Sequence, residues 1–165
     1  MKKYGIFYGS ATGTTAKVAN EIGNNLESGK ADIINIKDAS PDQFGNYEVL
    51  ILGTSTWGDG EPEEDWYDML LGIETLSLRD KKIAFFGCGD ETMAETFCNG
   101  LGELYERLQK TGAQFIGKFN TNGYEFRKSK AVKDGEAIGL LLDEVNKPEL
   151  TAQRIKEWIE LIKNA

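Results

Sequence analysis

The chain has 165 residues, 40% hydrophobic and 28% charged, a composition typical of one soluble globular domain over residues 1–165. Its net charge of −8 without a basic cluster argues against nucleic acid as a partner, and it contains no histidine, which excludes Ser–His and Cys–His nucleophilic pairs. No apolar run approaches the ~20 residues that span a bilayer, and no signal peptide precedes the first strand pattern, so we expect a cytoplasmic protein.

The first elements are a strand, a hydroxyl-rich turn and a helix. Residues 4–8 form an apolar run typical of a buried strand, and Val18, Ile22 and Leu26 recur at helical spacing, which predicts a helix over about residues 13–28. The turn between them exposes the N–H groups of a helix start, where an anion is favoured. It lacks the lysine of a P-loop and the glycine pattern of a dinucleotide site. We therefore predict a binding loop for a terminal monophosphate, with an ordinary N-cap turn as the alternative; its residues are Ser10, Ala11, Thr12, Gly13, Thr14 and Thr15.

The remaining elements alternate between strands and helices. Strands are expected at residues 31–36, 48–53, 82–87 and 115–119, with a further apolar stretch at 139–143 and a polar, lysine-rich segment before it. One helix is expected to begin at Pro62, another to end at Gly112, and the last to be capped by Thr151. This alternation predicts an α/β domain with a parallel sheet, whose ligand lies beyond the carboxyl ends of the strands.

The loop after the third strand is polar and glycine-bearing, and it carries an aromatic residue directly before one of its glycines. Trp57 is well placed to stack on a flat ligand, although it could also fold back onto its own domain. Gly58 lets the following peptide adopt either orientation of a tight turn, so that this peptide can present a carbonyl or an N–H to a ring nitrogen. The candidate binding residues of this second loop are Ser55, Thr56, Trp57, Gly58, Asp59 and Gly60.

The loop after the fourth strand, residues 88–98, is the third candidate. Gly87 and Gly89 give it backbone freedom, so its N–H groups are expected to meet the carbonyl edge of a heterocycle. Cys88 and Cys98 are expected to be reduced packing residues, because no neighbouring cation in the sequence would lower a thiol pKa. Asp90 is either a turn former or a ligand.

Acidic residues crowd the second and third loops. Such a ring of carboxylates would disfavour added negative charge on a bound ligand, and would lower its potential if the ligand accepts electrons. The alternative is a solvated helix face, which we expect for Glu63 and Glu64. The residues concerned are Asp59, Glu61, Glu63, Glu64, Asp65, Asp68, Asp90, Glu91 and Glu95.

Together these motifs resemble the flavodoxin family, and specifically its long-chain members. The pattern Ile6-Phe7-Tyr8-x-Ser10-x-x-Gly13-x-Thr15 resembles the family's phosphate loop, Thr56 to Glu61 its second loop, and Gly87-x-Gly89-Asp90 its third. Residues 121–144 resemble the insertion that splits strand five. The resemblance implies a three-layer fold with a five-stranded parallel sheet of order 2-1-3-4-5 and helices on both faces.

The same resemblance implies FMN as the cofactor. Residues 10–15 would bind its phosphate, Trp57 would cover one face of the flavin ring, and Cys88, Gly89 and Asp90 would meet its pyrimidine edge. The third loop is one residue shorter than usual and lacks the family's stacking tyrosine, with Met93 nearest its place. Thr96 and Cys98 stand where polar partners of the cofactor are found.

The function implied is a low-potential single-electron carrier that binds FMN noncovalently, and not an enzyme. Its partners would be redox proteins with basic docking surfaces, such as a flavodoxin/ferredoxin reductase or an oxidoreductase, and the chain would be a monomer. One alternative is a flavin-dependent NAD(P)H:quinone reductase of the same fold, with a deeper pocket at an oligomer interface. A phospho-acceptor signalling domain is disfavoured, because the first strand ends in Tyr8-Gly9-Ser10 without an acid.

Overall fold

The computed structural model describes all 165 residues and contains one central parallel sheet. Its strands lie in the order β2-β1-β3-β5, and two short strands, β6 and β9, both run parallel to β5 at the far edge. Counted over the parallel strands alone, this is the predicted order 2-1-3-4-5: β5 is the fourth strand, and β6 and β9 are the two pieces of the split fifth strand. The expected fold class is therefore confirmed. The strands are β1 (Lys2–Gly9), β2 (Ala31–Asn35), β3 (Tyr47–Trp57), β5 (Lys82–Cys88), β6 (Gln114–Phe115) and β9 (Leu140–Leu142).

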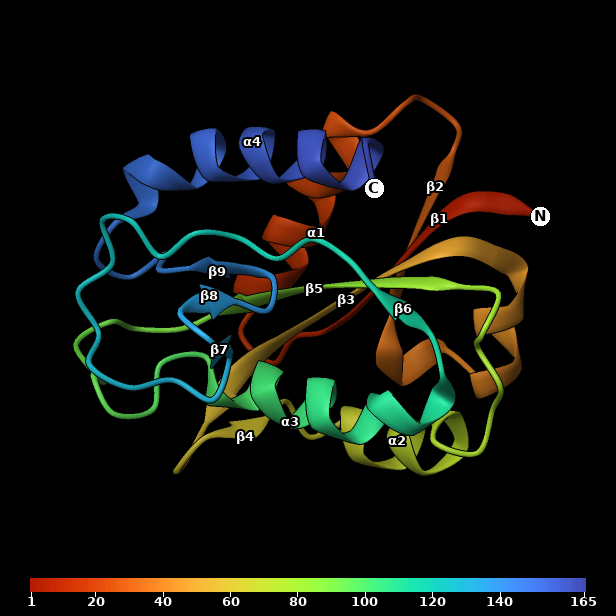
Figure 1. Ribbon diagram of the computed structural model, residues 1–165, viewed down its shortest axis with the longest axis horizontal. Helices are drawn as coiled ribbons and strands as arrows, with labels where there is room; N and C mark the ends of the chain where they lie inside the picture. Colours follow the sequence, from red (N-terminus) through yellow and green to blue (C-terminus); the bar gives the residue numbers. More distant parts are fainter.

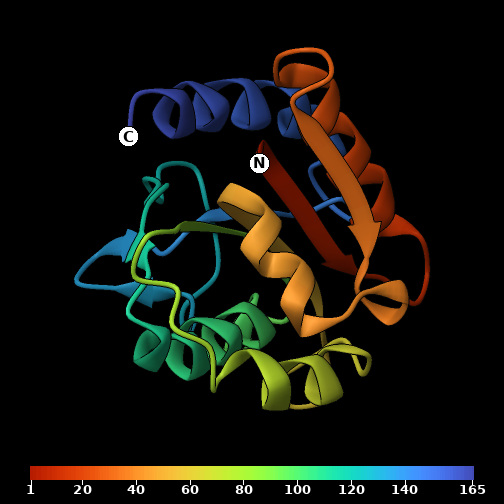
Figure 2. The same ribbon diagram turned by 90° about the vertical axis from the view of Figure 1, so that its right-hand side faces the viewer.

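Four α-helices cover the sheet, two on each face (Figure 1). Helices α1 (Thr14–Asn25) and α4 (Thr151–Lys163) pack on one face, and α2 (Trp66–Ile73) and α3 (Asn99–Leu108) pack on the other. The view along the sheet in Figure 2 shows the three layers, with α4 and α1 above the strands and α2 and α3 below them. None of these helices is both long and apolar enough to cross a bilayer.

Short elements fill the connections. Four 3-10 helices lie at Ile36–Asp38, Pro41–Asn46, Gln109–Thr111 and Pro148–Leu150. Strand β4 (Glu61–Pro62) folds back antiparallel on the end of β3, and β7 (Val132–Lys133) pairs with β8 (Glu136–Ala137) inside the insertion.

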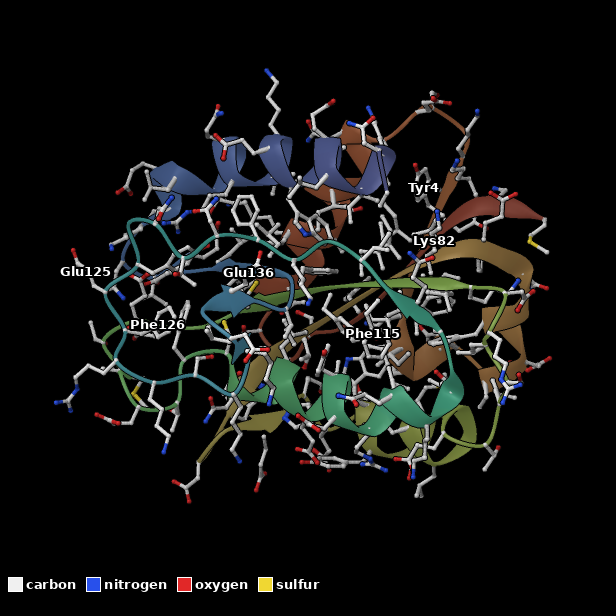
Figure 3. All side chains as sticks on the ribbon, viewed as in Figure 1. Tyr4, Lys82, Phe115, Glu125, Phe126 and Glu136 are labelled. Atoms are coloured by element: carbon white, nitrogen blue, oxygen red, sulfur yellow. The ribbon has the colours of Figure 1, made fainter.

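The core lies between the sheet and each helix layer. The central strands are buried on both faces, as their continuous apolar runs predict, and Leu50, Ile51 and Leu52 of β3 are fully buried. Phe115 of β6 lies on the side of the sheet that faces α3 (Figure 3), where its ring centroid is 5.0 Å from that of Tyr105 and 5.4 Å from that of Phe85.

Two predicted helix starts are wrong. Pro62 lies in β4, paired with Thr56, because the second loop turns back as a hairpin, and the helix begins only at Trp66. Thr151 is the first helical residue rather than the cap, because the preceding 3-10 turn at Pro148–Leu150 leads directly into α4 and places Leu150 at the N-cap. The hydroxyl of Thr151 is buried without a hydrogen-bond partner.

Three element lengths also differ from the prediction. Helix α1 ends at Asn25 rather than at residue 28, and β3 continues through the predicted loop to Trp57. The strand expected at 115–119 stops at Phe115; shortly afterwards Gly117, at φ +81°, bends the chain away from β5.

Candidate functional site

Three loops meet at the carboxyl ends of β1, β3 and β5, at the left of Figure 1. The parallel register places Gly9 beside Thr54 and Ser55 beside Cys88, so the loops that follow these strands emerge at one edge of the sheet. Strand order reverses between β1 and β3, which is where open α/β sheets bind ligands.

The first loop presents unpaired donors around the start of α1. Gly13, at φ +93°, turns the chain into the helix, and its N–H donates to Ser10 Oγ at 3.1 Å. The N–H groups of Thr14, Thr15 and Ala16 have no acceptor within the protein, and no side chain caps this helix. The ordinary N-cap alternative therefore does not describe this turn. Instead, it presents free donors at the positive end of a helix.

The hydroxyls of this loop fall into two groups. Thr12 is exposed and Thr14 is half-buried, and neither side chain hydrogen-bonds within the protein, whereas the side chain of Thr15 is buried. Ala11 is exposed at the outer rim. The loop can thus offer several donors to one anion, and Thr15 faces the interior.

The second loop forms the β3–β4 hairpin. Trp57 is 43% exposed, and its indole N–H donates to Ser55 Oγ at 2.8 Å, so this ring stays at the surface instead of entering the core. Thr56 Oγ1 accepts the Gly100 N–H at 3.0 Å, which ties the loop to the start of α3. Asp59 is exposed at the tip.

Both glycines of this hairpin have left-handed backbones. Gly58 has φ +53° and Gly60 has φ +118°, and the Gly60 N–H closes the turn on the Trp57 carbonyl at 3.0 Å. A Cβ at Gly60 would lie 2.7 Å from Asn99, whereas one at Gly58 would meet no atom within 4 Å. Gly58 therefore holds a left-handed backbone that other residues adopt only with strain, which suits a turn that changes orientation.

The third loop has a buried base and an exposed tip. Burial raises the pKa of the Cys88 thiol to about 12 and also raises that of Cys98, so both thiols stay protonated and unreactive, as expected for packing residues. Within the third loop, the Gly89 N–H donates to the Leu142 carbonyl at 2.9 Å, so this one N–H of the predicted set is engaged within the protein. Met93 is 56% exposed, and Thr96 is half-buried.

Asp90 is a turn former in this structure. Its Oδ1 accepts the Thr92 N–H at 2.8 Å and the Asn146 side-chain amide at 2.7 Å. Hydrogen bonding from the Thr92 hydroxyl is the main cause of its lowered carboxyl pKa.

Two hollows adjoin this arrangement. A small cleft of about 70 Å³ lies between the second and third loops, and it is lined by Thr56, Gly58, Gly89, Asp90, Met93, Thr96, Phe97 and Cys98. A wider hollow of about 560 Å³ lies between the first loop and the second, and it is lined by Ala11, Trp57, Glu61, Pro62, Glu63, Glu64 and Tyr67. Trp57 lines the wider hollow and Gly58 lines the cleft, so residues of all three predicted loops line these two hollows.

Glu63 was predicted on a solvated face, and this prediction is wrong, although Glu64 is exposed as expected. Glu63 is 5% exposed, its N–H donates to Thr54 Oγ1 at 2.8 Å, and its Oε2 accepts the Asp65 N–H at 2.9 Å. Desolvation raises the pKa of its carboxyl. The hairpin turns this one acid inward beneath the second loop, which the local run of acids does not reveal.

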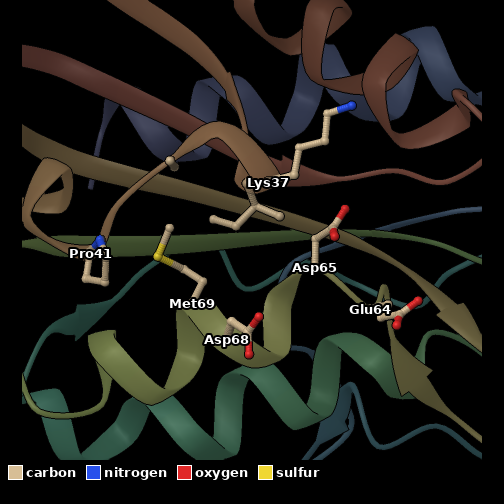
Figure 4. A pocket seen from close by; sticks show the side chains of 8 residues that line it. Lys37, Pro41, Glu64, Asp65, Asp68 and Met69 are labelled. Carbon is tan, nitrogen blue, oxygen red and sulfur yellow. The ribbon is translucent and has the colours of Figure 1, made fainter.

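A separate acidic hollow of about 340 Å³ lies beside α2 (Figure 4). Asp65, Asp68 and Met69 line it on the helix side, opposite Lys37 and Pro41, and it contains none of the predicted binding residues. The negative surface therefore extends from the loop region along α2.

Comparison with known proteins identifies relatives of the whole chain. The model of the flavodoxin family matches residues 6–158. The chain is 39% identical to a flavodoxin of Synechocystis over 99% of its length and 97% of that protein, and 38% identical to flavodoxin 1 of Azotobacter vinelandii over 98% and 96%. The crystal structure of Fusobacterium nucleatum flavodoxin bound to flavin mononucleotide superposes with a TM-score of 0.93 at 35% identity, covering 99% of this chain and 98% of that one.

The fold and the hydroxyl-rich helix start define a doubly wound α/β protein with a loop of free N–H donors at its switch point. The comparisons make the class specific: the chain belongs to the flavodoxin family. The resemblance drawn from its motifs is thereby confirmed.

Proposed function

We propose that this flavodoxin binds FMN noncovalently and carries single electrons at low potential between redox proteins. Flavodoxins are FMN-binding electron carriers rather than enzymes. The observation that carries the proposal is the first loop, where three consecutive helix-start N–H groups lack an acceptor within the protein. A terminal phosphate is the group that such a set of donors fits.

The residues present fit the remainder of FMN as well. Trp57 offers an exposed indole face on one side of the hairpin, and Met93 offers an exposed thioether on the third loop. Thr56, Thr96 and the backbone of residues 88–90 would face the ring and its ribityl chain. When bound, FMN supplies the redox chemistry, while the protein positions it and tunes its potential.

Two features of the chain would set that potential. Because glycine tolerates the left-handed backbone seen at Gly58, we expect the following peptide to present either its carbonyl or its N–H toward the ring and so to follow a protonation change there. The acidic residues of both loops would disfavour added negative charge by ~1 kcal/mol per close pair in bulk water, and by more near a protein surface.

The same acidic surface supports the proposed partners. Acidic side chains lie along the second loop and α2, around the wider hollow beside Trp57 and the acidic hollow beside α2: Glu61, Glu64, Asp65 and Asp68. Redox proteins with basic docking surfaces would be attracted to it and would meet it faster at low ionic strength. A cytoplasmic monomer completes the proposal.

A reductive titration of the FMN-loaded protein with dithionite, followed by visible absorption, tests this function. We expect two separate one-electron steps, with the second well below the first in potential. Direct two-electron bleaching, together with steady NAD(P)H-dependent reduction of quinones by the isolated protein, would contradict it and would favour the quinone reductase alternative.

A further inference from the structure

The third loop has no regular secondary structure of its own and depends on distant segments for its shape. Residues 94–97 are fixed by the insertion, whose Lys128 N–H donates to the Ala94 carbonyl at 2.8 Å. Residues 89–91 are fixed by the segment that follows β9: besides the Gly89 bond to Leu142, the Glu91 N–H donates to Asp143 Oδ2 at 3.1 Å. These bonds connect the loop to both segments and add to its own turn bonds, such as the one from the Met93 N–H to the Asp90 carbonyl at 2.9 Å.

Two carboxylates are buried at this junction, and they are satisfied in different ways. Asp143 is fully buried and accepts four bonds from neutral donors: the N–H groups of Glu91, Val145 and Asn146, and the Asn146 side-chain amide. Glu91 is 5% exposed, and neither of its carboxylate oxygens has a hydrogen-bond partner of good geometry. Its one ion pair is with Lys147, whose Nζ lies 2.8 Å from Glu91 Oε2.

Lys147 also joins the insertion to this junction. Its ammonium donates to the Gly123 carbonyl at 3.1 Å and lies 3.6 Å from Glu125, which Figure 3 labels on the insertion at the loop end of the molecule. One cation thus connects the third loop, the insertion and the segment after β9. Because a buried charge without its partner is strongly unfavourable, Glu91 keeps its place only while Lys147 is present.

We propose that Lys147 is a positioning residue for the flavin ring: through Glu91 it fixes the backbone of residues 89–93, of which Gly89, Asp90 and Met93 line the cleft together with Gly58. The inference rests on the proposed function, since it concerns how the third loop meets the ring end of FMN. Lys147 itself lines neither the cleft nor the phosphate loop. Replacing Lys147 should therefore weaken the contacts with the ring end of FMN and leave the contacts with its phosphate unchanged.

The test compares FMN with riboflavin, which lacks the phosphate, by fluorescence quenching on the full chain stripped of flavin. We expect Lys147→Met to weaken both ligands by ~10-fold, so that the ratio of their affinities stays that of the wild type. Lys147→Arg, which preserves the charge, should restore most of the affinity. The control is Lys30→Met, which removes the cation of the exposed Lys30–Glu27 pair and should leave both affinities unchanged.

A second variant separates positioning from folding. Glu91→Gln with Lys147→Met removes both charges of the pair, so that neither is left buried without its partner. It should fold like the wild type by circular dichroism and, because it lacks the ion pair that positions the loop, still bind riboflavin ~10-fold more weakly. The inference is overturned if this double variant binds both ligands like the wild type, if only FMN is affected, or if Lys147→Arg restores nothing. If the wild type binds neither ligand, the proposed function itself fails.

Discussion

Thr54, near the end of β3, connects this strand to the buried Glu63, and its hydroxyl gives the sharpest stability prediction. The side chain is fully buried; Oγ1 accepts the Glu63 N–H at 2.8 Å and donates to the Ser55 carbonyl at 2.9 Å. Thr54→Val replaces this hydroxyl with a methyl group and leaves a buried N–H without an acceptor. Such a loss costs about 1–3 kcal/mol in free energy of unfolding.

A loss of about 2 kcal/mol in a domain of this size lowers Tm by about 4–8 °C. Urea unfolding of the apoprotein, followed by circular dichroism, should show a lower midpoint with an unchanged m-value. Thr54→Ser, which keeps the hydroxyl, should recover most of the loss. Thr75→Val removes an exposed hydroxyl that donates to Gly72 and should stay within about 0.5 kcal/mol of the wild type. An unchanged midpoint in Thr54→Val would show that the Glu63 N–H finds another partner, and would refute the assignment of this bond.

Three further outcomes test the site. Because the pKa of Glu63 is raised above 4.5 in the folded state, the free energy of unfolding should fall as the pH rises above 4.5. Glu63→Gln should flatten this fall when urea midpoints are measured at a series of pH values, and parallel curves for the variant and the wild type would contradict the assignment to Glu63. Gly13→Ala should cost about 1–2 kcal/mol in unfolding free energy through its left-handed backbone alone, since its Cβ would meet no atom. Gly45→Ala, equally unobstructed but without a positive φ, is the matched control, and an equal cost in both would contradict the reasoning. Trp57→Ala should change unfolding free energy by less than about 0.5 kcal/mol yet weaken FMN binding by ~10-fold or more, and unchanged binding would remove the ring-stacking role.

The sheet could be predicted from the sequence because its signals are local. Continuous apolar runs such as residues 48–53 and 82–87 define strands buried on both faces, and their alternation with helical patterns determines a parallel topology. The phosphate loop could be found for the same reason, since a strand, a hydroxyl-rich turn and a helix follow one another directly.

The predictions that are wrong depend on contacts between distant residues or on how the chain enters an element. Pro62 is compatible with a helix start until the second loop folds into a hairpin beside Thr56. The two roles left open for Asp90 were not separated by its local bond to Thr92, and its bond to Asn146, 56 residues away, has no local signal. Lys147 carries no local signal, since a lysine in a polar segment is ordinarily solvated; only the folded chain brings it to Glu91.

The split of the fifth strand also affects how molecules of this protein meet one another. A long, open edge strand offers its unpaired N–H and C=O groups to a neighbouring chain and is a starting point for aggregation. Here that edge is divided between Gln114–Phe115 and Leu140–Leu142, and neither piece exceeds three residues. The insertion therefore leaves no continuous backbone ladder on this side, and the longer open edge of the parallel sheet is the five-residue β2 at the opposite side.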